Sequence, residues 1–283
     1  YMEIQQGVLN RLDRRTEELM DIQPQPAPED PAERFNWDAP IVVSPHDHKT
    51  LYFGSQRVWK STNRGDSWTP ISGDLTTNTN PFDLPMQTRV PGVEALYDNG
   101  AMSKYATLTA ISESPLRQGL LYTGSDDGLV HVSTDDGASW QEVGAFPGLP
   151  SRSFINDVEA SAHDDETIFV VADAHKEGDY SPYIYRSTNQ GKSWKNIAGD
   201  LPEGVIVWAL KQDPVNENLL FIGAENGLYF SYNQGQNWLK LSVGVPIISF
   251  RDIELHEREG DVIGGTFGRG MYVFDECTPL RHI

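Results

Sequence analysis

The sequence predicts an all-β chain made of β-propeller blades, each a four-stranded antiparallel sheet with strands A, B, C and D in order. The first observation behind this prediction is a motif, S-x-[D/N]-x-G-x-x-W, that occurs four times. Its copies start at Ser61, Ser133, Ser187 and Ser231, and so lie 72, 54 and 44 residues apart. The last spacing is close to the roughly 40–45 residues of one blade, and the longer ones predict insertions.

The second observation is that the surroundings of the motif repeat as well. An apolar run ending in Gly or Ala precedes each copy, at 51–54, 120–124, 167–172 and 219–224. A short turn and an alternating strand follow each run and lead into the motif. Alternation with period two between Gly-, Asn- and Asp-rich turns is the signature of β-hairpins. The motif is therefore predicted to form the hairpin between strands C and D.

Each motif position has a physical reason. Asp or Asn at the third position accepts hydrogen bonds from its own turn, the serine hydroxyl joins that network, glycine adopts a backbone conformation that other residues resist, and tryptophan buries a large ring. We therefore assign a structural role to the same four positions of every copy: Ser61, Asn63, Gly65, Trp68, Ser133, Asp135, Gly137, Trp140, Ser187, Asn189, Gly191, Trp194, Ser231, Asn233, Gly235 and Trp238.

These patterns divide the chain into four full blades and two partial ones. The divisions are the end of a partial blade at 1–22, blades at 23–75, 105–146, 152–201 and 204–245, an inserted loop at 76–104, and a partial last blade with a tail at 247–283. Because a propeller closes to hide its strand edges, we expect an additional chain segment or subunit to complete it. The alternative is closure by pairing 1–22 with the last blade.

Composition excludes several classes of function. The 283 residues bear a net charge of −19, which repels phosphate backbones and anionic lipid, so nucleic acid is not an expected partner. No apolar run approaches the roughly 20 residues of a membrane span, so no membrane insertion is expected. The single cysteine, Cys277, excludes an intrachain disulfide. No signal peptide is visible, and we interpret the first residues as the inside of a folded domain.

No motif for a cofactor, a metal or a catalytic nucleophile is present. His46 and His48 form an H-x-H pair without a visible third ligand, and zinc sites need three or four ligands. No phosphate-binding glycine loop, G-x-S-x-G or H-E-x-x-H occurs. We therefore expect neither a metal nor a cofactor.

The loops opposite the motif hairpins are the predicted binding face, because loops on a rigid scaffold commonly carry function. The turns between strands B and C lie there, together with insertions at 76–104 and 173–182. Candidate ligand-binding residues on this face are Trp37, His175, Tyr180, Tyr183, Trp208 and Arg269. Asp126, Asp127 and Glu225 are weak candidates for catalytic carboxylates.

The four motifs resemble the Asp-box, or bacterial neuraminidase (BNR), repeat. Longer stretches resemble the sortilin-type ten-bladed propeller family and its large bacterial relatives labelled as glycosyl hydrolases: 34–40, 44–47, 73–76 and 264–270. This resemblance implies an extracytoplasmic protein, periplasmic, secreted or at the cell surface, whose propeller binds peptides or glycans. Sialidases with such repeats use several arginines, for which Arg89, Arg152, Arg251 and Arg269 are available. Endo-glucanases of this type use two facing carboxylates, of which Asp126 or Asp127 could be one.

Three functional hypotheses follow. The first is a non-catalytic recognition module of an exported or cell-surface protein, which binds protein, peptide or glycan on its loop-bearing face. The alternative is a glycoside hydrolase, sialidase-like or xyloglucanase-like, with paired carboxylates in that face. A third is a cytoplasmic assembly scaffold. The lack of a clear catalytic constellation favours the first hypothesis.

Overall fold

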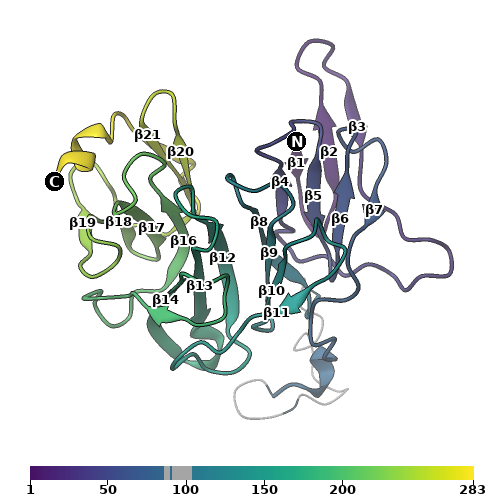
Figure 1. The fold of residues 1–283 in the computed structure, drawn as a ribbon, viewed down its shortest axis with the longest axis horizontal. Coiled ribbons are helices and arrows are strands. Elements are labelled where there is room, and N and C mark those ends of the chain that lie inside the picture. The colour runs from purple at the N-terminus through teal and green to yellow at the C-terminus, as the bar shows by residue number, and fades with distance from the viewer. Residues whose placement is uncertain (86–89, 91–103) are drawn as a thin grey trace. The chain divides into compact units, whose positions relative to one another are not determined.

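The chain is all-β and is built from propeller blades, as the repeats predict. The computed structural model describes residues 1–85, 90 and 104–283, and the strands in this part of the chain form six antiparallel sheets. The chain divides into two compact units. Unit 1 comprises residues 1–113 and 118–142, and unit 2 comprises residues 114–117 and 143–283 (Figure 1). No helix of the described part is long and apolar enough to cross a membrane.

Unit 1 contains one three-stranded and two four-stranded sheets. The first is formed by β1 (Met2–Glu3), β2 (Leu9–Leu12) and β3 (Leu19–Asp21). The second is formed by β4 (Ile41–Val43), β5 (Leu51–Gly54), β6 (Val58–Ser61) and β7 (Thr69–Pro70). The third is formed by β8 (Leu108–Glu113), β9 (Leu121–Ser125), β10 (Val130–Ser133) and β11 (Gln141–Glu142). A short 3-10 helix, η1 (Pro81–Asp83), follows β7.

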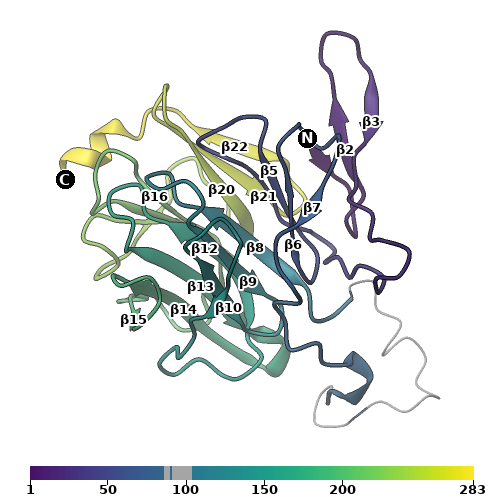
Figure 2. The ribbon, with the colours of Figure 1, turned by 45° about the vertical axis from the view of Figure 1, so that its right-hand side comes forward.

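Unit 2 contains two four-stranded sheets followed by a three-stranded one. The first is formed by β12 (Phe154–Ala160), β13 (Ile168–Ala174), β14 (Asp179–Ser187) and β15 (Lys195–Asn196). The second is formed by β16 (Val207–Gln212), β17 (Leu220–Ala224), β18 (Gly227–Ser231) and β19 (Leu239–Leu241). The third is formed by β20 (Phe250–His256), β21 (Asp261–Thr266) and β22 (Met271–Phe274). Figure 2 shows these strands from a second direction.

The core lies between successive sheets of each unit. In unit 2, for example, Phe169 and Val171 of β13 belong to the same buried cluster as Leu220 and Ile222 of β17. Five of the second and third strands, β5, β9, β13, β17 and β18, are buried on both faces because their sheets pack against neighbouring sheets. Burying each such side chain stabilises the fold by about 1.5–3 kcal/mol.

The eight-residue motif forms the hairpin between the third and fourth strands, as predicted. In the last copy, the Gly235 amide donates to the Ser231 hydroxyl at 2.8 Å, and the Asn237 amide donates to Oδ1 of Asn233 at 2.9 Å. Gln234 and Gly235 adopt left-handed φ angles of 58° and 82°. The first and third motif residues therefore satisfy the backbone of a turn that glycine makes possible.

Each motif also docks on the preceding blade, which its sequence alone does not show. The Trp238 indole donates to the carbonyl oxygen of Ile197 at 3.0 Å, and a Cβ atom on Gly235 would lie 2.7 Å from that same oxygen. Trp68 and Trp140 donate in the same way to Ile22 and Ile71. The glycine thus permits close approach between blades, in addition to its turn conformation.

Trp194 is the exception among the four motif tryptophans. Its indole nitrogen is buried and has no hydrogen-bond partner in the described part of the chain. The Phe146 ring packs against it instead, with the ring centroids 4.7 Å apart. This junction is therefore held by ring packing where the other three use a hydrogen bond.

The segment 173–182 differs from the enlarged loop that the sequence predicts. Instead of a loop, the hairpin itself grows longer: Ala174 of β13 pairs with Asp179 of β14. Only η2 (His175–Glu177) and Gly178 remain between the two strands. Gly178 has a φ of 83°, which closes the short turn and lets the strands continue. Most of the other predicted insertion, 76–104, lies outside the described residues.

The docking of the motif glycine predicts a large loss of stability for Gly235→Ala. The added Cβ would collide with the Ile197 carbonyl and also occupy a left-handed conformation, so we expect a loss of about 3 kcal/mol or more in the free energy of unfolding. Gly148→Ala is the matched control, since Gly148 has a φ of 78° but open space around its Cβ position. It should lose about 1 kcal/mol. Urea unfolding followed by tryptophan fluorescence measures both, and equal losses would contradict the docking role.

Candidate functional site

The first strand of four blades contains an irregularity at the same place. The pairing register with the second strand skips one residue at Thr109 in β8, Asn156 in β12, Trp208 in β16 and Arg251 in β20. A β-bulge of this kind redirects a side chain and is frequent beside functional sites. Three of the four lie in unit 2, on successive blades.

The bulged side chains of unit 2 are linked to one another. Arg251 lies over the Trp208 ring, with its guanidinium carbon 3.6 Å from the ring centroid. The Trp208 indole donates to Oε2 of Glu225 at 2.9 Å, and the Ser249 hydroxyl donates to the same oxygen at 3.0 Å. Glu225 also faces Nη2 of Arg251 at 3.7 Å. One carboxylate therefore fixes both the indole and the guanidinium stacked on it.

A second carboxylate organises the other side of this group. Asp173 is only 3% exposed and accepts a hydrogen bond from Nδ2 of Asn156 at 2.9 Å. The same amide nitrogen donates to the Val207 carbonyl oxygen at 2.9 Å. Asp173 also contacts Nδ1 of His175, and the His175 ring meets the Trp208 ring edge-on, 5.6 Å between centroids. We call these six residues the bulge cluster: Asn156, Asp173, His175, Trp208, Glu225 and Arg251.

Arg251 is the group of the bulge cluster best prepared to bind a ligand. The rings of Trp208 and Phe267 lie 3.6 and 5.5 Å from its guanidinium carbon, and its side chain is 44% exposed. Arg251 forms an ion pair with Glu225 at 3.7 Å, and its N–H groups donate no hydrogen bond to any described residue. A guanidinium offers five donors in a fixed fork, so Arg251 presents ordered donors to an oxygen-bearing ligand.

A row of charged side chains lies on the same first strands, next to the bulges. Lys211 of β16 donates to Oε2 of Glu159 on β12 at 2.9 Å and faces Glu254 of β20 at 3.9 Å. Glu159 raises the pKa of Lys211 above its ordinary range. Burial raises the pKa of Glu159 to about 7, and burial also raises the pKa of Asp157 to about 6. These carboxyls are therefore ionised only at a cost near neutral pH.

Three residues predicted from the sequence, His175, Trp208 and Glu225, come together in the bulge cluster. Tyr183 lies in β14, where its hydroxyl donates to Asp179 at 2.6 Å and burial raises its pKa. Tyr180 is 54% exposed on the same strand. Arg269 is exposed in the turn between β21 and β22. In the described part of the chain, none of these three forms a hydrogen bond, ion pair or ring contact with the bulge cluster, although all belong to unit 2.

The remaining candidates belong to unit 1. Asp126 accepts hydrogen bonds from the amide and hydroxyl of Thr107 at 2.9 and 2.8 Å. Asp127 accepts bonds from the amide and hydroxyl of Thr77, both at 2.7 Å. Both carboxylates are buried and hold the connections between blades. Trp37 is half-buried, and its carbonyl accepts a bond from the Gln6 amide.

The sequence-based candidate set missed Asn156 and Asp173, and it included Arg251 only in a group of four arginines. Of those four, Arg89 lies outside the described residues, and Arg152 pairs with Glu177 at 3.4 Å. A signal was available: Asn156, Trp208 and Arg251 each follow the first buried apolar residue of an A strand. A bulge inserts one extra residue into the alternation of inward- and outward-facing side chains along a strand. Such an interruption is hard to recognise in the sequence of a single strand.

Comparison with known proteins supports the fold. No protein-family model matches the sequence, and no curated protein matches it significantly. An ancestral GH74 enzyme superposes with a TM-score of 0.58 at 19% identity, over 84% of this chain and 28% of the enzyme. The GH74 xyloglucanase from Xanthomonas campestris superposes with a TM-score of 0.61 at 16% identity, over 84% of this chain and 36% of the enzyme. The extracellular domain of a putative one-component system from B. thetaiotaomicron superposes with a TM-score of 0.54 at 14% identity, over 87% of this chain and 28% of that domain.

This chain therefore spans between 28% and 36% of the length of these three structures. At such low identity the similarity concerns the propeller fold. It leaves the activity of this chain to be argued from its own residues.

The raised pKa values predict a stability that falls as the pH rises. Between about pH 4.5 and 7 the folded state holds a proton on Glu159 that the unfolded state has released, so the folded state is favoured at the acidic end of this range. The free energy of unfolding of Glu159→Gln should fall by about 1–3 kcal/mol less than that of the wild type between pH 5 and pH 8. Thermal and urea unfolding of both proteins at pH 5 and at pH 8 measure these free energies. The exposed Glu166→Gln in the same blade should keep the wild-type slope, and identical slopes for both variants would contradict the assignment.

Proposed function

We propose that this chain is a non-catalytic recognition module that binds an oxygen-rich ligand, a peptide or a glycan, at the bulge cluster of unit 2. The observation that supports it most is the convergence of three bulged side chains from successive blades on two fixed carboxylates. Stacked guanidinium and aromatic groups give a ligand both donors and apolar faces, which is the composition typical of binding sites.

The carboxylates of the site favour binding over hydrolysis. Asp173 and Glu225 already accept hydrogen bonds from neighbouring side chains, so both are committed to holding Asn156 and Trp208. Asp126 and Asp127 are buried and saturated in the same sense. A glycosidase needs one carboxyl free to protonate the leaving oxygen and a second to act on the opposite face of the sugar.

A glycoside hydrolase is nevertheless the second candidate, because the two GH74 enzymes share the fold. Incubation with xyloglucan, followed by an assay for new reducing ends, separates the two. We expect no hydrolysis. Release of reducing ends that Glu225→Gln abolishes would overturn the non-catalytic proposal.

We place the module in an exported or cell-surface protein of the sortilin-type, Asp-box class, completed by further chain or by a subunit. The likeness to the extracellular domain of a putative one-component system supports the location. The three-stranded first and last sheets support completion, because the other sheets have four strands. Mass spectrometry of the native protein and its copurifying chains tests both points.

Arg251→Ala is the variant that tests the proposed site. Binders are first selected against the intact chain from a display library of random twelve-residue peptides and from an array of plant and bacterial glycans. Loss of hydrogen bonds to a charged donor should then weaken a selected ligand by about ten- to a hundredfold, measured by calorimetry.

The matched control is Arg258→Ala in the same blade, whose side chain is 82% exposed in the turn between β20 and β21. It removes the same charge and should leave the affinity unchanged. Selected ligands that bind Arg251→Ala as tightly as the wild type, or an absence of any selected ligand, would contradict the proposal.

A further inference from the structure

The last sheet of unit 2 ends on a strand with one unpaired edge. β22 pairs with β21, and no other strand of the described part of the chain pairs with it. The four-stranded sheets have a short fourth strand at this position, which pairs with the third strand at two or three positions. The open edge of β22 therefore presents backbone N–H and C=O groups to any strand that approaches it.

Two residues of β22, Met271 and Val273, direct their backbone groups to this edge. The Thr266 amide donates to the Gly270 carbonyl at 3.0 Å, and these two residues continue the register of the β21–β22 pair. Because hydrogen-bonded positions alternate along an antiparallel pair, the next residue bonded to β21 is Tyr272. The side chains of Met271 and Val273 are 78% and 54% exposed, so they do not shield the edge.

β22 also lacks the residues that protect the outer edges of the other sheets. Proteins guard such edges with charged side chains or proline. The last strand of each of the other five sheets contains one of these: Asp21 in β3, Pro70 in β7, Glu142 in β11, Lys195 in β15 and Lys240 in β19. β22 consists of Met-Tyr-Val-Phe. An apolar edge beside five guarded ones indicates that this edge is covered in the functional protein.

The chain itself leads away from the open edge after β22. Residues 275–283 contain neither the glycine nor the tryptophan of the motif. The Cys277 amide donates to the Gly260 carbonyl at 2.6 Å, on the side of β22 that is already paired. Arg281 then binds the buried Asp213 carboxylate, with Nε and Nη2 both 2.9 Å from Oδ2. These contacts fix the tail on the turn before β21 and on the preceding blade, so the tail does not supply a fourth strand.

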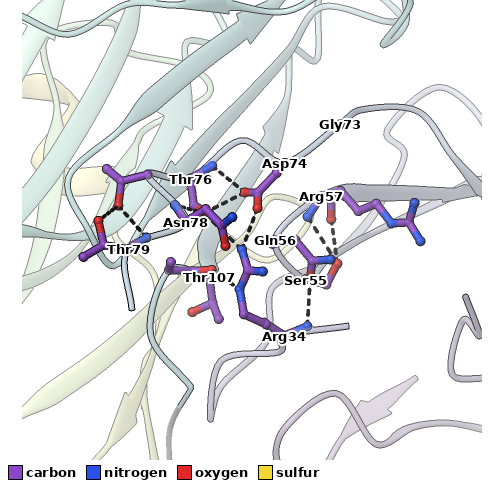
Figure 3. A network of polar contacts seen from close by, with 12 residues as sticks. Arg34, Ser55, Gln56, Arg57, Gly73, Asp74, Thr76, Asn78, Thr79 and Thr107 are labelled. Atoms are coloured by element: carbon purple, nitrogen blue, oxygen red, sulfur yellow. Dashed lines mark hydrogen bonds and ion pairs between the residues drawn. The ribbon is translucent and has the colours of Figure 1, made fainter. Parts of the chain in front are cut away.

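Unit 1 shows how a short fourth strand is retained in this fold. β7 pairs with β6 at only two positions, and the residues after it are fixed as well. The Leu75 amide donates to the Gln56 carbonyl at 2.9 Å. Asp74 accepts hydrogen bonds from Nη2 of Arg34 at 2.6 Å and from the Thr76 amide at 3.0 Å, as Figure 3 shows. A strand added at this position therefore needs contacts beyond its paired residues.

We propose that the edge of β22 binds an extended segment of a partner protein, which adds an antiparallel fourth strand to the last sheet. This inference rests on the proposed completion of the chain by a subunit, and it is separate from ligand binding at the bulge cluster. Tyr272 and Phe274 pack against the buried cluster of this sheet and continue its apolar face to the edge. The centre of the segment is therefore apolar and β-branched, as suits a strand.

Charges at the two ends of β22 supply the contacts beyond the paired residues. Arg269 is exposed before β22, and Asp275 and Glu276 are exposed after it. In the described part of the chain, none of the three forms an ion pair. An antiparallel strand brings its first residues beside Asp275 and Glu276 and its last residues beside Arg269. Lysine or arginine at the start of the segment and aspartate or glutamate at its end are complementary to these charges.

Val273→Pro tests the proposed strand addition. The probe is a fluorescent, blocked nonapeptide, Lys-Lys-Val-Thr-Ile-Thr-Val-Glu-Glu, titrated against the intact chain by fluorescence anisotropy. Proline removes the N–H that is directed to the open edge and leaves the pairing of Tyr272 with β21, so we expect binding at least about tenfold weaker. Val273→Thr is the matched control, because it retains the N–H and the β-branched shape, and it should keep the wild-type affinity. Circular dichroism verifies that both variants are folded.

Two further peptides separate strand addition from other kinds of attraction. A peptide with the lysine and glutamate pairs exchanged has the same composition and net charge and should bind about tenfold more weakly. The probe with N-methyl groups on its central residues should not bind, since it cannot donate backbone hydrogen bonds. The proposal is overturned if the probe fails to bind, or if Val273→Pro, the exchanged peptide or the methylated peptide binds as tightly as the wild-type pair.

Two more measurements identify the occupant and isolate the site. Light scattering of the chain alone should show a monomer, and self-association that Val273→Pro abolishes would assign the edge to a second copy and overturn the proposal. Arg251→Ala should bind the probe as the wild type does. A failure of the bulge cluster to bind its ligand is thus distinguished from a failure of the β22 edge, and loss of probe binding in Arg251→Ala would contradict the edge as the binding site.

Discussion

The structure depends on one repeated contact, the seating of a motif glycine and tryptophan on the blade that precedes them. Gly235 allows the turn to approach the Ile197 backbone closely, and Trp238 then hydrogen-bonds the same carbonyl. The motif therefore does more than close its own hairpin: it joins consecutive sheets, which also meet through apolar side chains and through polar contacts such as that of Lys211 with Glu159. The motif is present in four of the six sheets of the described chain, and three of its four tryptophans make this hydrogen bond. The fold therefore grows by repetition of local steps, which suits a chain without a disulfide.

A scaffold fixed in this way can tolerate irregularity in its first strands. The register skips at Asn156, Trp208 and Arg251 interrupt the strand pairing, and each interruption weakens local hydrogen bonding. The second and third strands β17 and β18 pair without a register shift and are buried, so the irregularity at Trp208 does not spread through that sheet. The burial of Asp157 and Glu159 beside the bulges adds a further local cost near neutral pH. The combination of strained pairing and costly charge is concentrated in the first strands of unit 2, as expected where stability is exchanged for function.

The sequence was sufficient for the fold because its signals are local. The motif, the apolar runs and the turns each lie within about ten residues, and their repetition multiplies their weight. It was insufficient for much of the site, because the partners of Arg251 are 43 residues away at Trp208 and 26 at Glu225. Asp126 and Asp127 show another limit. The sequence suggests them as weak candidates for catalytic carboxylates in a turn, but both are buried and accept hydrogen bonds from Thr107 and Thr77. Pairing of this kind depends on how blades meet, which periodicity does not encode.

The two Gly-Asp-Leu segments, Gly73–Leu75 and Gly199–Leu201, show that the same tripeptide makes different contacts at two junctions between blades. Asp200 accepts hydrogen bonds from the next motif, at Asn237 and Trp238. Asp74 instead accepts them from Thr76, which follows it in the chain, and from Arg34. The residue that corresponds to Thr76 in the second segment is Pro202, which has no N–H to donate. The fourth residue of the motif is left-handed in every copy, and its amide donates to the turn between the first two strands of its own blade, at the carbonyl of Lys49, Gly119, Glu166 or Asn218. Each motif is therefore held to its own blade as well as to the preceding one.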